Sequence, residues 1–247
     1  MYSNAYVFRY AAIMVILVAA ALASVAVLLK PAQDRNVAIE KMRNILAAAN
    51  VEASADNAIE LFDKYIVEEN VISPQGDVVG VYKNKKLEKG EIRGFNINLK
   101  EELYKHTKGE EYVLPLYVAD VNGKRLIIFP LLGRGLWGPV YGNLALEEDF
   151  VTVAGSMFGH DKETPGLGAE IEQPAFESQF TGKKIFDENG NFTSIKVLKG
   201  ASQILAPDQL IHNVDAISGG TITSNGVSEM IQSNLTNYLD YIKKQKP

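Results

Sequence analysis

The sequence contains no cysteine and only three histidines. Without cysteine there is no disulfide, no thiolate metal site and no cysteine nucleophile, although a cysteine-free domain tolerates reducing and oxidising compartments alike. The histidines His106, His160 and His212 are too scattered for a His-Glu-x-x-His metal pair, and their positions are typical of surface or packing residues. The sequence therefore predicts no metal site.

Basic residues are in the minority, with 25 Lys and Arg against 30 Asp and Glu. Nucleic-acid binding needs concentrated Lys and Arg, and no basic stripe is present, so we exclude that class of partner. A Gly-Lys-Ser/Thr phosphate loop is also missing, and the glycine spacing around Ser156 is not that of a nucleophile elbow. NTPase and hydrolase functions are unsupported, and we predict no catalytic residue.

The apolar residues are concentrated near the N-terminus. Residues 11–29 carry no charge and include only Ser24 as a polar member, which suits a helix crossing a hydrocarbon layer about 30 Å thick. A cleaved signal peptide is the alternative, because residues 21–23 have the small-x-small form of a cleavage site. The apolar run continues past that point, which favours a single transmembrane anchor within residues 1–30.

The basic residues beside the span indicate on which side of the membrane the large domain lies. One basic residue, Arg9, precedes the span, whereas four follow it: Lys30, Arg35, Lys41 and Arg43. Counted this way, the large domain faces the cytoplasm. The acidic residues among them and the length of the domain weaken the count, because long domains translocate regardless of flanking charge.

Two short helices are expected between the anchor and the main domain, over residues 31–70. Pro31 is expected to end the span, and residues 36–51 then place apolar side chains on one helical face. A second helix is expected to start at Ser54 or Asp56 and to bury three side chains: Ile59, Phe62 and Ile66.

From residue 71 to residue 247 the pattern is that of short strands separated by glycine, asparagine and proline. Asn-Gly pairs at 122–123 and 189–190 each lie between apolar runs and predict two hairpins. Residues 224–244 show a 3.6-residue apolar stripe and predict a closing helix. The fold class is α+β, with one N-terminal transmembrane helix followed by a mixed helix and antiparallel-sheet domain.

One glycine-rich loop has the spacing of a dinucleotide fingerprint. Residues 133–138 read G-R-G-L-W-G, but Pro139 and Gly142 follow where a helix should begin, and no βαβ unit surrounds the loop. The loop is either a surface turn that packs Trp137, or a place where glycines give a flat ligand close access to the backbone.

A second unusual segment, S-G-G-T-I-T-S-N-G-V at 218–227, precedes the closing helix. One interpretation is a helix cap, because Ser and Thr side chains accept hydrogen bonds from the first free N–H groups of a helix. The other is an anion site, because the same N–H groups and the positive end of the helix dipole stabilise a phosphate. Thr221, Thr223 and Ser224 surround that point.

Two motifs carry a resemblance. Residues 215–223, D-A-I-S-G-G-T-I-T, resemble the D-x-x-[ST]-G-A-T-x-[ST] signature at which a flavin transferase attaches FMN, and residues 160–168, H-D-K-E-T-P-G-L-G, resemble the E-T-P-G-[LIM]-G segment of the same proteins. The chain is similar to the NqrC family of sodium-translocating NADH:quinone oxidoreductase subunits, to which RnfG is related. Gly220 stands where that family usually has alanine.

The resemblance implies that Thr223 carries FMN through a phosphoester made by the flavin transferase. It also implies that further motif positions are recognised by the transferase or surround the phosphate: Asp215, Ser218, Gly219, Gly220, Thr221 and Ile222. Near the flavin ring it implies Trp137, Gly138, Glu163, Thr164 and Leu167.

The implied function is that of a flavoprotein subunit that passes electrons from NADH towards quinone within a sodium-exporting complex of several subunits. The flavin supplies the redox chemistry and the protein tunes it. The resemblance also implies a single-pass protein of the bacterial inner membrane whose domain faces the periplasm, against the charge count. The alternatives are an RnfG-like subunit of a ferredoxin:NAD oxidoreductase and a membrane-anchored binding module without flavin.

Overall fold

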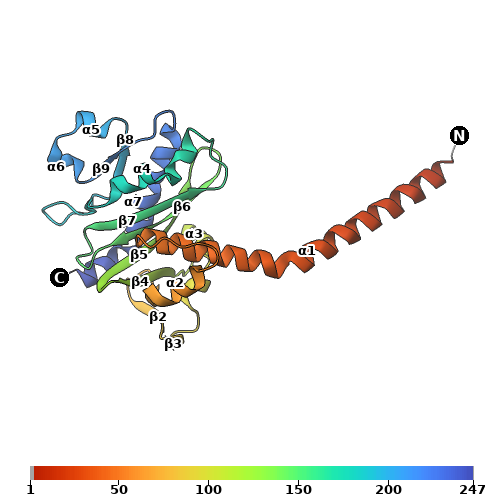
Figure 1. The fold of residues 1–247 in the computed structure, drawn as a ribbon, viewed down its shortest axis with the longest axis horizontal. Coiled ribbons are helices and arrows are strands. Elements are labelled where there is room, and N and C mark those ends of the chain that lie inside the picture. The colour runs from red at the N-terminus through yellow and green to blue at the C-terminus, as the bar shows by residue number, and fades with distance from the viewer. Residues whose placement is uncertain (1–2, 247) are drawn as a thin grey trace. The chain divides into compact units, whose positions relative to one another are not determined.

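The computed structural model describes residues 3–246 and is drawn in Figure 1. Residues 1 and 2 of the expected anchor region and residue 247 of the expected domain lie outside the described residues. The chain divides into two compact units, Met1–Lys41 and the residues from Met42 onward. Part of the expected juxtamembrane segment belongs to the second unit, because Ile45, Leu46 and Phe62 are buried in its core.

The first helix, α1 (Asn4–Ala48), runs through Pro31, so the expectation that Pro31 ends the span is wrong. A proline removes one backbone donor and strains only the preceding turn, and the residues on both sides are strong helix formers. Among the described residues, α1 is the one helix long and apolar enough to cross a membrane. The large apolar side chains of α1 between residues 6 and 29 are exposed, as a lipid-facing surface requires, whereas those at its C-terminal end are buried in the domain.

An antiparallel sheet of seven strands forms the centre of the second unit, in the order β3-β2-β1-β4-β5-β6-β7. The strands are β1 (Ile66–Ile72), β2 (Val78–Lys83), β3 (Lys86–Lys89), β4 (Leu114–Val121), β5 (Lys124–Arg134), β6 (Pro139–Leu146) and β7 (Val153–His160). A separate parallel pair joins β8 (Lys196–Leu198) to β9 (Asn213–Asp215). The expected α+β class and antiparallel sheet are confirmed.

The sheet is buried on both faces, because alternate residues along its central strands enter different cores. In β5, Ile127 and Phe129 belong to one core, whereas Leu126 and Ile128 belong to the other. This is the period-two alternation of a pleated strand. Unlike a half-solvated antiparallel sheet, the central strands therefore read as almost continuous apolar runs.

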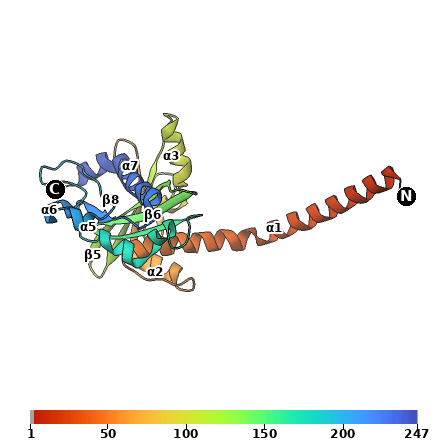
Figure 2. The same ribbon diagram turned by 90° about the horizontal axis from the view of Figure 1, so that it is seen from above.

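Helices cover each face. The closing helix α7 (Thr221–Gln245) packs across β5 and β6 through Val227, Met230 and Ile231. The opposite face holds the end of α1 and α2 (Ala58–Tyr65), and Figure 2 shows α7 and α2 on opposite sides of the sheet. The remaining helices are α3 (Leu99–Thr107), α4 (Pro174–Glu177), α5 (Ala201–Ile204), α6 (Pro207–Leu210) and the 3₁₀ turns η1 (Gly94–Asn96), η2 (Gly168–Glu172) and η3 (Ser178–Phe180).

The local predictions have mixed outcomes. The hairpin at 122–123 is confirmed, with Val121 paired to Lys124 and both turn residues at positive φ. The hairpin at 189–190 is reduced to one bridge between Phe186 and Phe192, because β8 pairs with β9 instead. In the second helix Phe62 is buried as expected, whereas Ile59 is exposed and its expected burial is wrong.

Candidate functional site

None of the surrounding hydroxyl groups caps the first turn of α7. The helix begins at Thr221, three residues before the expected start, and its N-cap is Gly220, which makes no side-chain capping bond. Ser224 N–H donates to the Gly220 carbonyl. The N–H groups of residues 221–223 have no acceptor among the described residues. Because free donors at a helix N-terminus stabilise an anion, this geometry favours the anion-site interpretation over the cap.

The hydroxyl groups of the segment point in different directions. Thr221 and Ser218 are exposed. Thr223 is 2% exposed, and its hydroxyl donates a 2.5 Å hydrogen bond to Glu163 Oε2. Ser224 is fully buried and accepts a bond from Ile217 N–H. The hydroxyl expected to carry the flavin is therefore covered, and it lies against a carboxylate.

The cover over Thr223 is the segment of residues 161–168. A Cβ on Gly168 would lie 2.4 Å from Thr223 Oγ1, so the backbone of Gly168 rests on the hydroxyl. Leu167 N–H donates to the Thr164 carbonyl and Gly166 N–H donates to the Glu170 carboxylate, whereas Asp161 N–H ties the start of the segment to the Pro139 carbonyl of β6. In the described chain no backbone hydrogen bond joins residues 162–168 to α7. Gly168 is also the first residue of η2, which packs against α7 and β7, so uncovering Thr223 requires the start of η2 to move with the segment.

The glycines before α7 allow the chain to approach the 161–168 segment closely. Gly219 has a φ of +75°, and a Cβ there would lie 2.6 Å from Leu167 Cδ2. At Gly220 a Cβ would lie 3.1 Å from Ile217 Cγ2 and 3.2 Å from the Leu167 carbonyl oxygen. Glycine at position 220 therefore avoids contacts of 3.1–3.2 Å that the Cβ of alanine, the usual residue in the family that the motif resembles, would make in this chain.

Glu163 is the polar centre of the region. Its side chain is 5% exposed, and besides the bond from Thr223 it accepts a 2.8 Å bond from Trp137 N–H at Oε1. Two glycines leave room for this carboxylate: a Cβ on Gly135 would lie 2.6 Å from Oε1, and a Cβ on Gly168 would lie 2.6 Å from Oε2. The carboxylate thus joins the β5–β6 turn, the 161–168 segment and α7.

Apolar side chains are exposed on the same three segments. Trp137 is 64% exposed and Leu167 is 43% exposed, and Ile222 on the first turn of α7 is also exposed. Leu136, which the sequence analysis did not select, is exposed beside Trp137. Large apolar side chains gathered at a surface are typical of a ligand or partner site.

The other expected site residues are less close to the first turn of α7. Gly138 closes the β5–β6 turn by accepting a bond from Gly135 N–H, and Thr164 is exposed. The Asp215 carboxylate accepts a bond from Ser202 N–H in the first turn of α5, and hydrogen bonds from Ser202 lower the pKa of Asp215. Asp215 therefore holds α5, and no hydrogen bond to the first turn of α7 is found for it in the described chain.

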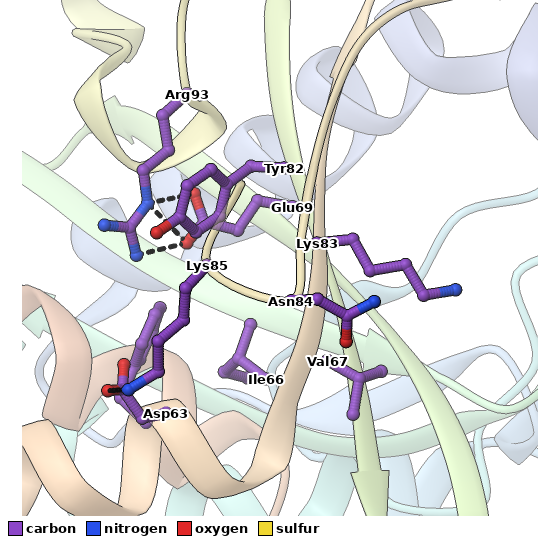
Figure 3. Close-up of a pocket in the computed structure, with 10 residues that line it drawn as sticks. Asp63, Ile66, Val67, Glu69, Tyr82, Lys83, Asn84, Lys85 and Arg93 are labelled. Atoms are coloured by element: carbon purple, nitrogen blue, oxygen red, sulfur yellow. Dashed lines mark hydrogen bonds and ion pairs between the residues drawn. The ribbon is translucent and has the colours of Figure 1, made fainter. Parts of the chain in front are cut away.

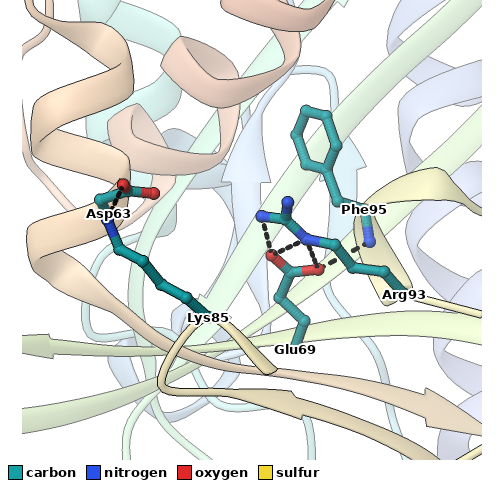
Figure 4. A network of polar contacts seen from close by, with 5 residues as sticks. All are labelled: Asp63, Glu69, Lys85, Arg93 and Phe95. Atoms are coloured by element: carbon teal, nitrogen blue, oxygen red, sulfur yellow. Dashed lines mark hydrogen bonds and ion pairs between the residues drawn. The ribbon is translucent and has the colours of Figure 1, made fainter. Parts of the chain in front are cut away.

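A separate hollow of about 430 Å³ lies beside α2 and the β1–β2 edge of the sheet, and Figure 3 shows its lining. At its wall Glu69 accepts two bonds from Arg93 Nε and one from Nη2, together with a fourth from Phe95 N–H (Figure 4). The Arg93 guanidinium also lies 4.2 Å from the Tyr82 ring centroid. The hydrogen-bonding groups of Glu69 and Arg93 are thus used within the chain, and we interpret the ion pair as a structural contact between β1 and the segment before η1 rather than as a ligand-binding group.

The residues at the start of α7 fit a phosphate-bearing flat ligand. Unpaired N–H groups suit the phosphate, threonine hydroxyls lie on the same turn, and Trp137, Leu167 and Ile222 offer apolar surface for a ring system. No cluster of metal ligands is found in the part of the chain that the structure describes.

The similarity of the chain to known proteins also points to a flavin phosphate as the ligand of this region. Residues 135–236 match the family model described as the FMN-binding domain. Three similar proteins are the NqrC subunits of the Na⁺-translocating NADH-quinone reductases of Vibrio vulnificus (35% identical, covering 82% of this chain and 79% of that protein), Haemophilus ducreyi (35%, 83% and 79%) and Pseudomonas aeruginosa (32%, 85% and 82%).

Two solved structures have a similar fold. The crystal structure of the same reductase subunit from Parabacteroides distasonis is 35% identical, with a TM-score of 0.73 over 87% of this chain and 96% of that one. The Shewanella oneidensis NqrC structure is 24% identical, with a TM-score of 0.67 over 87% and 99%, and supports the fold alone.

Proposed function

Because this chain belongs to the NqrC family of Na⁺-translocating NADH-quinone reductase subunits, with its FMN-binding domain, we propose that it holds FMN as a phosphate ester on Thr223. The chain is a flavoprotein subunit of a multi-subunit oxidoreductase. The similarity to NqrC proteins favours this function over that of an RnfG-like subunit, and the FMN-binding domain favours it over a binding module without flavin.

The observation that supports this site is the set of free N–H groups in the first turn of α7, where Thr223 is the third residue. Helical side chains tilt towards the N-terminus, so a phosphate on the Thr223 hydroxyl lies near those donors. They stabilise the phosphate without a lysine or an arginine. The bond to Glu163 holds this hydroxyl in one direction.

The burial of Thr223 sets a condition on the proposal. A transferase must reach the hydroxyl, so attachment requires the 161–168 segment to move away from α7. The hydrogen bonds that tie this segment to the first turn of α7 and to the β5–β6 turn run through one side chain, Glu163. After attachment the ester prevents the segment from returning to the same position, because Gly168 lies directly against Thr223 Oγ1.

FMN, when bound, supplies the electron transfer. Trp137, Leu167 and Ile222 provide apolar contacts for the ring and exclude water from one side of it. A covalent link keeps a shallow site fully occupied, because the ligand cannot diffuse away.

Intact-protein mass spectrometry tests the attachment after co-expression of the full chain with a flavin transferase. We expect the wild-type chain to carry the FMN mass, Thr223→Val to lack it, and Thr221→Val to acquire it more slowly, because Thr221 is a motif position without being the attachment point. Valine keeps the shape of threonine and removes only the hydroxyl, and Thr221 is the comparison because its hydroxyl is exposed on the same turn. An adduct that survives in Thr223→Val and disappears in Thr221→Val would move the ester to Thr221, and no adduct in any chain would refute covalent attachment.

We also propose that α1 anchors the chain in a bacterial inner membrane with the domain in the periplasm. The support for the anchor is the exposed apolar surface of α1. For the periplasmic side the support is the family resemblance, which we prefer to the count of flanking charges because long domains translocate regardless of that count.

A further inference from the structure

Glu163 occupies an unusual position for a carboxylate. It is 5% exposed, and no ion pair joins it to a lysine, an arginine or a histidine within the described chain. A buried carboxyl group without a cation is costly unless its oxygens are hydrogen-bonded. Here each oxygen accepts one bond, from Trp137 N–H and from the Thr223 hydroxyl, and the positive end of α7 adds to the stabilisation.

These two bonds join parts of the chain that are far apart in sequence. Trp137 lies in the β5–β6 turn, which closes through the bond from Gly135 N–H to the Gly138 carbonyl. Thr223 is the third residue of α7. The glycines at 135 and 168 are needed for the carboxylate to fit, because a Cβ at either position would lie 2.6 Å from one of its oxygens. The packing is therefore built around Glu163.

We infer that Glu163 is a positioning residue whose carboxylate links the turn carrying Trp137 to the first turn of α7. Its carboxylate accepts from the Trp137 amide and orients the Thr223 hydroxyl. The consequence for the flavin rests on the proposed function: the hydroxyl to be esterified and the turn beside it are hydrogen-bonded to the same carboxylate, which adds to the close packing of Gly226 against Arg134 and Gly135. Ester formation joins Thr223 Oγ1 to the flavin-proximal phosphorus of a flavin dinucleotide supplied with the transferase, breaks the diphosphate bond with release of the nucleoside monophosphate, and removes the hydroxyl proton. Thr223 then no longer donates, and the Trp137 amide is the remaining donor of the pair.

Hydrogen–deuterium exchange of the full chain without FMN tests this role directly. In Glu163→Met, a side chain of similar volume without a comparable acceptor, we expect the Trp137 amide to exchange at least about tenfold faster, equivalent to about 1.4 kcal/mol. Glu163→Gln is the matched control. Its carbonyl can accept from Trp137 N–H and its NH₂ can donate to the Thr223 hydroxyl, so protection should return to within about threefold of wild type.

Thr223→Val supplies a second measurement if Glu163→Met does not fold. It removes only the bond to α7, so the Ser224 amide should exchange faster while the Trp137 amide and the middle of α7 remain protected. The inference is overturned if Trp137 exchanges equally in Glu163→Met and wild type, or if Thr223→Val leaves the Ser224 amide unchanged.

The initial rate of FMN attachment by the transferase, followed by intact mass, gives the functional readout. We expect Glu163→Met to acquire FMN at least about tenfold more slowly than wild type, because a misdirected hydroxyl reacts more slowly, and Glu163→Gln to stay within about threefold. Equal or faster attachment in Glu163→Met would contradict the positioning role. If no chain acquires FMN, the proposed function fails, but the exchange experiment still decides the role of Glu163.

Discussion

The close packing of Gly168 against the Thr223–Glu163 pair makes Gly168→Ala a sharp test of the site. An alanine Cβ at this position would lie 2.4 Å from Thr223 Oγ1 and 2.6 Å from Glu163 Oε2. Both partners are buried, so neither can move aside into solvent. The substitution must therefore displace η2 from α7 or break the hydrogen bond between the two side chains.

The expected loss of stability follows from three contributions. Overpacking a dense core costs about 1–3 kcal/mol. Losing a hydrogen bond to a charged group costs about 1.5–3 kcal/mol. Replacing glycine with alanine returns about 0.4–1 kcal/mol through the unfolded chain. Either cost alone leaves a net destabilisation of about 1.5 kcal/mol and both together leave about 3.5 kcal/mol, so the melting temperature should fall by about 3–14 °C in a domain of this size.

Thermal unfolding of the FMN-free full chain in detergent, followed by far-ultraviolet circular dichroism, measures this change. Gly138→Ala is the matched control, because its Cβ would meet only the Lys162 side chain at 3.5 Å, an ordinary contact. The control should stay within about 1 kcal/mol of wild type, as an uncrowded glycine replacement does. If Gly168→Ala melts at the same temperature as Gly138→Ala, the packing described around Glu163 is incorrect.

Two further predictions concern the domain and its orientation. Burial raises the pKa of Glu177 to about 6, so the folded state binds the carboxyl proton of Glu177 more tightly than the unfolded state does. The contribution of this group to stability is therefore complete below about pH 4.5 and falls by about 1 kcal/mol as the pH rises through 6. Urea unfolding at about pH 4 and about pH 8 should show this decrease in the wild-type chain and not in Glu177→Gln. The chain has no cysteine, so a single cysteine in the exposed turn at Asn189 or at Ser3 reports the side of the membrane on which it lies. If the domain is periplasmic, Asn189→Cys reacts in intact cells with a maleimide that does not cross the inner membrane, whereas Ser3→Cys reacts only after permeabilisation. The reverse pattern would place the domain in the cytoplasm.

Features set by neighbouring residues were predictable from the sequence. The apolar run at 11–29 predicted a helix able to span a membrane, the Asn-Gly pair at 122–123 predicted a hairpin, and the apolar stripe after residue 224 predicted α7. Each of these depends on composition or period over a few turns. Pro31 was the exception, because the strong helix formers on both sides outweigh one missing donor.

The surroundings of each hydroxyl could not be predicted in this way. Thr221 and Thr223 are two residues apart, and at about 100° per residue they point roughly 200° apart around α7. Which of them faces solvent depends on where the helix begins and on which side of it packs against the rest of the domain. Glu163 lies in a distant part of the sequence, yet its carboxylate binds Thr223 and leaves Thr221 outside.

By itself, then, the sequence determined the class of fold and the apolar span, and it supplied the motif from which we propose the flavin-phosphate segment, because periodicity and short motifs are local properties. Only the tertiary structure decided the direction of each side chain in that segment and the cover over Thr223. The physical reason is that burial arises from contacts between α7, the β5–β6 turn and the 161–168 segment, which come together only in the folded chain.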